Sequence, residues 1–375
     1  MGQLLRAHGS SHGPSGGREI EVAKKVGAAR HHGGIIAPGR EAVKLDYRMA
    51  PPDQPGLFDE AARPPDPVLT ALGNAVPAGI RFGTSTWTYD GWTGDVYHRP
   101  YRGPQAARRL EEYARYPLFR TVGIDSAFYE PLSEDTLREY ARALPPGFPC
   151  VSKVWDRITA QRFGSSPKWG NQAGMKNPDF LNADLFIESV IGPYARAFRD
   201  HAGCFVFEFQ AMHGKDLPPI DDWAGQLDQF LGRLPRDFRY AVELRNPELL
   251  HERHGVVLRR HGVAHVFNSW SEMPDIGEQL DLPWTFPAAF TVARALLRPG
   301  RRYADAVKLF EPYKRVQEPV PELRLDLVRL IEEAVRRRIE AFILANNRAE
   351  GNAPGTIRAV VEQWQARDAG GTERV

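Results

Sequence analysis

From Ile80 to the end of the chain, short hydrophobic runs alternate with longer stretches in which apolar residues recur every three or four positions. Eight of the short runs are rich in β-branched and aromatic residues: Ile80–Ser85, Thr121–Asp125, Phe148–Val154, Cys204–Gln210, Phe238–Leu244, Val263–Ser269, Phe290–Leu296 and Ala341–Asn347. Amphipathic helical segments separate most of them: Ala106–Tyr116, Ser133–Leu144, Ala183–Arg199, Asp221–Leu234, Pro247–Arg260 and Leu323–Arg338, with a last one at Pro354–Arg367. Strands that alternate with helices predict a parallel sheet, and eight such units predict an α/β fold of the (β/α)8 or TIM-barrel type.

A doubly wound open sheet is the alternative fold for this alternation. It would be expected to carry a glycine-rich phosphate turn after its first strand. The residues Gly83-Thr84-Ser85-Thr86 do not have that spacing, so the pattern favours the closed barrel.

Residues 1–78 differ from the rest of the chain in having no sustained hydrophobic period. They are rich in Gly, His, Arg and Pro, a composition that buries too little apolar surface to offset the entropy lost on ordering. We predict a disordered N-terminal extension over residues 1–78, a barrel domain over 79–368 and a disordered tail over 369–375. Met49 opens the more protein-like part of the extension, and it is an expected alternative start of the native protein.

One short motif stands out in the extension. Gln54-Pro55-Gly56-Leu57-Phe58 resembles the pentapeptide with which bacterial replication and repair proteins dock on the sliding clamp. An extended segment that presents two adjacent apolar side chains is suited to a surface groove. The motif predicts the sliding clamp as a partner through Gln54, Leu57 and Phe58.

Composition changes this picture little. The formal net charge of +2 gives no general electrostatic drive towards nucleic acid or membranes, although a local basic groove would be hidden by it. The 2 cysteines, Cys150 and Cys204, lie in apolar runs and suit a reducing cytosol. There is no apolar run of transmembrane length and no secretory signal, so we expect a soluble cytoplasmic protein that does not bind membranes.

Polar side chains are expected to gather at the carboxyl ends of the strands, where barrel enzymes place their chemistry. In Cys204–Gln210 the alternation directs Phe205 and its alternate neighbours to the outer helices, and Glu208 into the barrel. The same reasoning directs Glu243 inward from the next strand. Other inward or strand-end polar residues are Ser85, Asp125, Lys153, Arg245, Asn268, Arg294, Asn346 and Asn347.

Two interpretations of this polar cluster are open. Buried charges must be paired or used, so Lys153 and Arg245 with Glu208 and Glu243 could be salt bridges that close the top of the core. Polar residues from most strands, however, favour a functional site. Aromatic residues follow the strand ends too, and Trp87, Tyr89, Trp92 and Tyr129 are expected either to stack on a ligand ring at the mouth or to pack beneath loops.

Metal and cofactor binding are not predicted. His261 and His265 have helical ligand spacing, but they flank the start of a strand, where residues four apart lie roughly 13 Å apart. Asp125, Glu208 and Glu243 could hold a hard cation through oxygen, but the neighbouring Lys and Arg compete for the same carboxylates.

The run Gly83-Thr84-Ser85-Thr86-Trp87-Thr88-Tyr89-Asp90-Gly91-Trp92 resembles the opening signature of the YecE-like family DUF72, a domain of unknown function. Further matches follow in order: Ser126–Tyr129, Ser152-Lys153, Val242–Arg245, Arg294, Asn346-Asn347 and Gly351–Ala353. The resemblance implies a TIM barrel and no established reaction. The chain departs from the family's usual Glu-x-Asn in the second strand, where it has Gly123-Ile124-Asp125, and from the R-x-H-G after Arg294.

Three functions follow as hypotheses. The first is a hydrolase or lyase acting on a phosphorylated sugar or nucleic-acid fragment. In it Glu208 and Glu243 are the acid/base pair, one with a raised pKa, with Lys153 and Asp125 beside them. Lys153, Arg245 and Arg294 would bind an anionic group, and Asn346 and Asn347 would orient the ligand. The second is a non-catalytic nucleic-acid-binding module of a repair assembly, tethered through residues 54–58. The third is a metal-dependent isomerase or an endonuclease resembling endonuclease IV, by analogy of fold alone.

Overall fold

A computed structural model describes residues 66–372, apart from 102, 104, 165 and 166. Eight strands form one sheet in the order β1-β8-β7-β6-β5-β4-β3-β2, and every ladder between neighbours is parallel. The strands are β1 (Ile80–Thr84), β2 (Val122–Ile124), β3 (Cys150–Lys153), β4 (Ala202–Glu208), β5 (Tyr240–Glu243), β6 (Ala264–Asn268), β7 (Phe290–Ala295) and β8 (Glu340–Ala345). The predicted TIM-barrel fold is confirmed.

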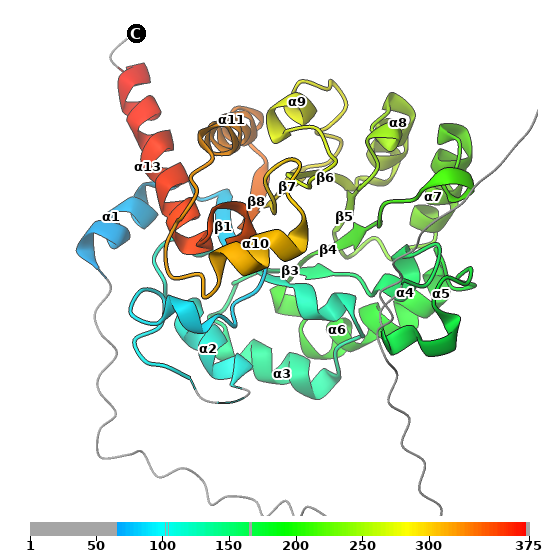
Figure 1. Cartoon of the computed structure of the whole chain (residues 1–375), viewed down its shortest axis with the longest axis horizontal. Helices are drawn as coiled ribbons and strands as arrows, with labels where there is room; N and C mark the ends of the chain where they lie inside the picture. The colour runs from blue at the N-terminus through cyan, green and yellow to red at the C-terminus, as the bar shows by residue number, and fades with distance from the viewer. Residues whose placement is uncertain (1–65, 102, 104, 165–166, 373–375) are drawn as a thin grey trace, which may run out of the picture. The chain divides into compact units, whose positions relative to one another are not determined.

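Helices surround the sheet, with α2, α3 and α6 below it and α8, α9 and α11 above it in Figure 1. Their bounds are α1 (Pro67–Ala75), α2 (Ala106–Tyr113), α3 (Glu134–Ala143), α4 (Asp156–Thr159), α5 (Ala183–Phe186), α6 (Gly192–Ala197), α7 (Ile220–Gly232), α8 (Glu252–His261), α9 (Ile276–Leu280), α10 (Tyr303–Phe310), α11 (Pro321–Arg337), α12 (Asn347–Glu350) and α13 (Ala353–Thr372). Among the described residues, no helix has both the length and the apolar character that crossing a membrane would require.

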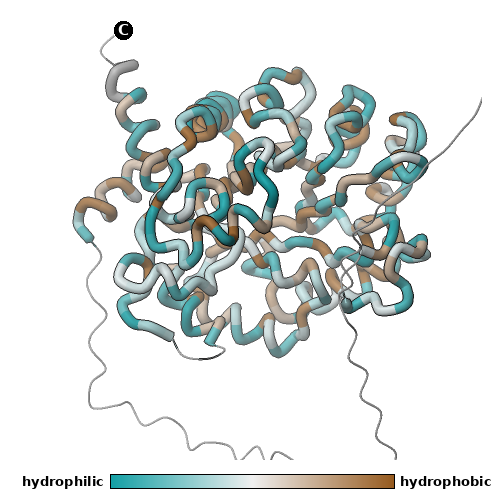
Figure 2. The backbone as a smooth tube through the Cα atoms, in the orientation of Figure 1, coloured by the Kyte–Doolittle hydropathy of each residue, from teal (hydrophilic) through white to brown (hydrophobic). Residues whose placement is uncertain are grey.

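The alternation of strand side chains divides the core into two layers. Phe205, Phe207 and Phe209 lie in the larger cluster between strands and helices, as predicted. Cys204 and Val206, on the opposite face of β4, belong to the smaller cluster that fills the barrel. The outer helices alternate between hydrophilic and hydrophobic turns in Figure 2, because only one side of each helix packs on the sheet.

The strand pairing of the barrel is weakest between β1 and β2. No ladder joins these two strands; instead the backbone amides of Arg120 and Thr121 donate to Phe82 O over 2.8 and 3.2 Å. Two glycines allow the approach, since a Cβ at Gly83 would lie 2.1 Å from Thr121 O and one at Gly123 would lie 2.6 Å from Ser85 O. Side chains at either position would therefore push β1 and β2 apart.

The amino-terminal end of the barrel is closed by charge. Glu340, at the start of β8, pairs with both Arg81 and Arg239. The guanidinium of Arg239 also lies over the rings of Phe290 and Phe342, at 5.2 and 5.1 Å. These contacts cover the lower end of the interior cluster, the face of such barrels that serves stability.

The structure differs from the predicted elements in several places. The tail that was predicted to be disordered over 369–375 is helical as far as Thr372, because α13 continues to that residue. Residues 67–75, which the composition placed in the N-terminal extension, form α1, whose Leu69 is buried in the core. The helix predicted over Ala183–Arg199 is α5 and α6 separated by a π-helical turn at Ile187–Ile191. The short helices α4, α9, α10 and α12 were not predicted. Residues 1–65 of the predicted extension, with Met49 and the clamp-like motif at Gln54–Phe58, lie outside the described residues.

Candidate functional site

Six charged side chains from five strand ends meet at the carboxyl-terminal mouth of the barrel. We call this set the mouth network: Asp125, Lys153, Glu208, Glu243, Arg245 and Arg294. Every member was predicted as a site residue, and each has at least one partner of opposite charge within the set. The three carboxylates and three cations have a formal charge of zero together. Pairing of opposite charges offsets part of the desolvation free energy of burying them.

Glu208 lies at the centre of the network. Its Oε2 is 2.9 Å from Lys153 Nζ, 2.8 Å from Arg245 Nη2 and 2.9 Å from Arg294 Nη1. Its Oε1 accepts a hydrogen bond of 2.8 Å from Gln210 Nε2. Burial alone would raise the pKa of Glu208, but the three cations outweigh it and hold the pKa well below its usual range. Glu208 is therefore ionised, the opposite of the raised pKa expected for a proton donor.

Arg294 joins the three carboxylates. Its Nη1 donates to Glu208 Oε2 and, over 2.5 Å, to Glu243 Oε2, while Nη2 donates to both oxygens of Asp125 at 3.1 and 2.9 Å. Burial would lower the pKa of Arg294, but the charges of Asp125, Glu243 and Glu208 raise it above the ordinary arginine value. The planar guanidinium suits such multiple bonding, which an ammonium could not reproduce.

Access to the mouth network is uneven. The side chain of Asp125 is 25% exposed and that of Lys153 is 11% exposed. Glu208, Glu243, Arg245 and Arg294 are 6% exposed or less. The network thus has a buried layer of four residues beneath two residues that a ligand can reach.

Several polar atoms at the mouth have no hydrogen-bond partner. Of the 13 such buried side-chain atoms among the described residues, six lie on residues at or just after strand ends. They are Ser85 Oγ, Glu243 Oε1, Arg245 Nη1, Arg294 Nε, Asn347 Nδ2 and Arg348 Nε. Glu243 Oε1 is 2.6 Å from Arg245 Nη2, within ion-pair range but without hydrogen-bond geometry. Unsatisfied buried groups are costly and concentrate at functional sites, so their density here marks the mouth as the candidate site.

Two of the aromatic residues predicted at the rim are buried instead. Trp87 is 2% exposed, donates from Nε1 to Ala106 O and packs edge-on against Tyr140. Trp92 is fully buried and donates from Nε1 to Asn347 Oδ1 over 3.2 Å. Their rings fill the space beneath the loop after β1, so stacking on a ligand does not apply to them.

Tyr89 and Tyr129 stay nearer the surface. Tyr129 is 62% exposed. Tyr89 is half-buried against Trp92 and Tyr313, and its burial raises the pKa of its hydroxyl to about 12. Tyr129 is therefore the aromatic residue of the predicted set that a ligand could contact most freely.

The predicted asparagines have structural partners. Asn268 donates to Leu244 O and accepts from the amide of Trp270, so both ends of its amide are engaged. Asn346 accepts from the backbone amide of Arg348 and caps α12. Asn347 accepts from Trp92 and from the amide of Ala353, and its buried Nδ2 has no hydrogen-bond partner.

Sequence reasoning missed Arg348 and Trp270. The guanidinium carbon of Arg348 lies 4.2 Å from the ring centroid of Tyr303. The guanidinium carbon of Arg245 lies 4.1 Å from the ring centroid of Trp270. Both residues follow a strand end within three positions, which is the signal that could have identified them.

The mouth does not fit a metal ion. Within the part of the chain that the structure describes, no group of three or more His, Cys, Asp or Glu side chains has the arrangement of a metal site. The three mouth carboxylates instead face guanidinium and ammonium groups, which occupy the oxygen atoms a hard cation would need.

The family model described as "Protein of unknown function DUF72" matches residues 81–374. The chain belongs to the DUF72 family. It is similar to a DUF72 protein of Enterococcus faecalis, at 16% identity and a TM-score of 0.55, over 76% of this chain and 95% of that one. It is also similar to a DUF72 protein of Thermotoga maritima, at 18% identity and a TM-score of 0.49, over 77% of this chain and 98% of that one. No curated protein matches it. At 16% identity the likeness to the Enterococcus faecalis protein establishes the fold alone.

This DUF72 chain shows what becomes of the acidic position in the second strand. Gly123 has no side chain and lies against Ser85, whereas Asp125, two residues later, supplies the carboxylate to Arg294. After Arg294 the chain continues with Ala295, Leu296 and Leu297, all buried, so a histidine ligand or proton donor is absent from these three positions.

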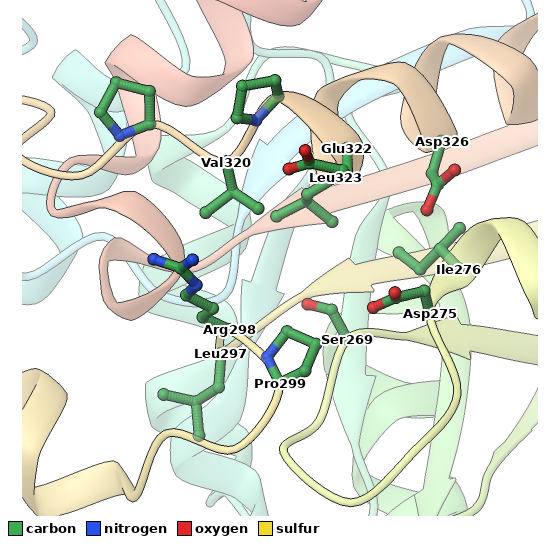
Figure 3. Close-up of a pocket in the computed structure, with 12 residues that line it drawn as sticks. Ser269, Asp275, Ile276, Leu297, Arg298, Pro299, Val320, Glu322, Leu323 and Asp326 are labelled. Atoms are coloured by element: carbon green, nitrogen blue, oxygen red, sulfur yellow. The ribbon is translucent and has the colours of Figure 1, made fainter.

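A hollow of about 400 Å³ in this DUF72 barrel lies beside the ends of β6 and β7. In Figure 3, Val320 and Leu323 point from the start of α11 towards Leu297 and Pro299. Its acidic residues have local roles, since Asp275 caps α9 and Asp326 accepts from the amide of Gly277. This hollow therefore supplies no chemistry comparable to the mouth network.

Proposed function

We propose that the chain is an enzyme, a hydrolase or lyase that acts at the barrel mouth on a phosphorylated sugar or a nucleic-acid fragment. The observation that carries the proposal is the Glu208 oxygen that meets Lys153, Arg245 and Arg294 at once. Stability alone rarely calls for three cations around one buried carboxylate, because an apolar core of the same shape is often at least as stable. Perturbed charges that converge on the face used by barrel enzymes favour chemistry there.

Asp125 and Lys153 are the groups proposed to touch the substrate. They have the largest exposed fractions in the mouth network, 25% and 11%. Asp125 follows β2 and Lys153 ends the neighbouring β3, where Ile124 pairs with Ser152. Asp125 would act as the base and Lys153 as the acid. Asp125 would accept a proton on one side of the breaking bond, and Lys153 would donate a proton on the other side. Lys153 also lies 3.8 Å from the ring centroid of Phe128, which shields one side of its ammonium group from water.

Glu208 and Glu243 are proposed as positioning residues. The lowered pKa of Glu208 disfavours a role as proton donor and suits a fixed negative charge that holds Lys153 in place. Arg294 joins Asp125 to the same carboxylates, so the reacting pair is held through the buried layer. Rigid support of this kind is what keeps a catalytic group within reach of its target.

The test is turnover of a panel of phosphorylated sugars and damaged DNA oligonucleotides by the full chain. Asp125→Asn should abolish any activity that is found, and Glu208→Gln should reduce it and shift its pH profile. Asp237→Asn is the matched control, because Asp237 is an exposed carboxylate that pairs with Arg199 ahead of β5, away from the mouth. Activity that survives both Asp125→Asn and Lys153→Met would remove the proposal.

A further inference from the structure

Arg348 differs from the cations of the mouth network in having no acidic partner. It lies in the first turn of α12, directly after β8, and is half-buried. The backbone amide and Nη1 of Arg348 donate to Asn346 Oδ1, at 3.0 and 3.2 Å. Its guanidinium also lies near the hydroxyl of Tyr313 and lowers the pKa of that hydroxyl, which burial raises. Among the described residues no carboxylate forms an ion pair with Arg348, and its buried Nε has no hydrogen-bond partner. In the part of the chain that the structure describes, no carboxylate therefore neutralises its positive charge, whereas Lys153, Arg245 and Arg294 each pair with Glu208.

Tyrosines surround this guanidinium. Tyr303, 49% exposed at the start of α10, lies beneath Arg348 at 4.2 Å from ring centroid to guanidinium carbon. The hydroxyl of Tyr89 has its pKa raised by burial and lowered by the charge of Arg348. The half-buried Arg348 therefore lies among aromatic rings of which two, Tyr303 and Tyr129, are open to solvent.

Tyr129 lies beside the mouth network, because its ring centroid is 5.6 Å from that of Phe128, which in turn lies 3.8 Å from Lys153 Nζ. Desolvation raises the pKa of the Tyr129 hydroxyl, the neighbouring Tyr303, Asp125 and Glu208 raise it further, and Arg348 lowers it. Arg348 and the partly exposed carboxylate Asp125 thus both act electrostatically on the hydroxyl of Tyr129.

We propose that Arg348 binds the phosphate of a ligand whose flat ring stacks on Tyr129 or Tyr303, so that the site takes a nucleotide-like phosphate ester. A guanidinium with free donors binds phosphate well, and exposed tyrosine faces bind bases and sugars by stacking. The inference rests on the proposed function only in treating the bound molecule as a substrate, and it replaces Arg245 and Arg294 as the anion-binding groups. Those two arginines are neutralised by carboxylates and almost fully buried.

Calorimetric titration of the full chain with adenosine 5′-monophosphate tests the site, with adenosine and inorganic phosphate as separate probes. The nucleotide should bind more tightly than either part, and Arg348→Gln should weaken its binding about tenfold or more, with Arg348→Lys in between. Tyr129→Ala should weaken it about fivefold, because one stacking face is lost. Lys308→Gln is the matched control, since Lys308 is an exposed cation on the neighbouring α10. It should change the affinity less than twofold.

In the titrations, the inference is overturned by no binding of the nucleotide, by equal affinity in Arg348→Gln, or by an equal loss in Lys308→Gln. An unchanged melting temperature in Arg348→Gln shows that lost affinity is not lost folding. Turnover with an unaltered KM in Arg348→Gln would sink this inference while the proposed function stands. Nucleotide binding that depends on Arg348, without turnover of any substrate, would support the inference and remove the proposed function.

Discussion

Glu208 and Glu243 lie directly opposite each other on the neighbouring strands β4 and β5, and one nitrogen of Arg294 joins them. That nitrogen, Nη1, is 2.9 Å from Glu208 Oε2 and 2.5 Å from Glu243 Oε2. Two buried carboxylates side by side repel each other strongly, so the pair depends on Arg294 and on Arg245, whose Nη2 lies 2.8 Å from Glu208 Oε2 and 2.6 Å from Glu243 Oε1. Arg294 also pairs with Asp125 and so joins all three carboxylates of the mouth network.

Removal of Arg294 should be severely destabilising. Arg294→Met leaves three carboxylates without their common partner, and we expect a loss of about 3–5 kcal/mol in the free energy of unfolding, measured by urea denaturation. Arg294→Lys should fall between, because an ammonium cannot bridge all three groups. Arg358→Met, which breaks the exposed pair with Glu362 on α13, should cost little. Similar losses in the Arg294 and Arg358 variants would contradict this account.

Acid should weaken the fold through two buried histidines. Burial lowers the pKa of His254 to about 3 and that of His265 to about 4, from an ordinary 6.5. Between pH 6.5 and about 4 the unfolded chain takes up protons that the folded chain refuses, so stability falls as the pH falls. Each histidine contributes up to about 1.4 kcal/mol per pH unit. Below that window, the lowered pKa of Glu208 acts in the same direction.

Urea denaturation at several pH values measures this slope. His254→Leu should reduce the slope between pH 6.5 and 5 by about half, since one of two equivalent contributions is removed. His213→Gln, at an exposed histidine, should leave the slope unchanged. A slope that His254→Leu does not alter would assign the acid sensitivity to other groups.

The junction of β1 and β2 should not tolerate a methyl group. Gly83→Ala would place a Cβ 2.1 Å from Thr121 O, and we expect a loss of at least about 2 kcal/mol, or failure to fold, by thermal denaturation. Gly225→Ala is the matched control, because no atom lies within 4 Å of its Cβ position on the exposed side of α7. That change should stabilise the chain by about 0.5–1 kcal/mol. Equal effects of the two changes would show that the close approach is not as tight as the geometry indicates.

A change at the amino-terminal end of the barrel should lower stability without changing ligand binding at the mouth. Glu340→Gln weakens the pairs with Arg81 and Arg239 at the amino-terminal end. It should lower the free energy of unfolding by about 1–3 kcal/mol and leave nucleotide affinity unchanged. Nucleotide affinity that falls along with stability would mean that the two ends are coupled.

The sequence predicted the strands and their faces well, because the alternation in β4 and β5 is unusually clean. Phe205, Phe207 and Phe209 could face only the helices, which directed Glu208 to the interior. The convergence of the mouth network followed from the parallel barrel itself, since all strands end at one rim.

The state of Glu208 and the placement of the tryptophans could not be read from the pattern. The pKa of Glu208 depends on how many cations reach one oxygen, a distance that strand periodicity does not encode. Trp87 and Trp92 follow a strand end in the way a rim residue does, but the loop folds over them. Arg348 lay next to Asn346 and Asn347 in the sequence, and only the absence of an acidic partner in the structure distinguishes it.

The weak joint between β1 and β2 has a consequence for how the barrel moves. A ring of seven strand ladders, closed between β1 and β2 by two N–H···O hydrogen bonds to Phe82 O, should deform first at that junction. Ser85 and Asp125 continue from the two strands that flank it, so a small separation there would widen the entrance beside Asp125 and leave the carboxylate pair undisturbed on the far strands. Transient opening of this one strand junction would then admit bulky molecules without a mobile lid.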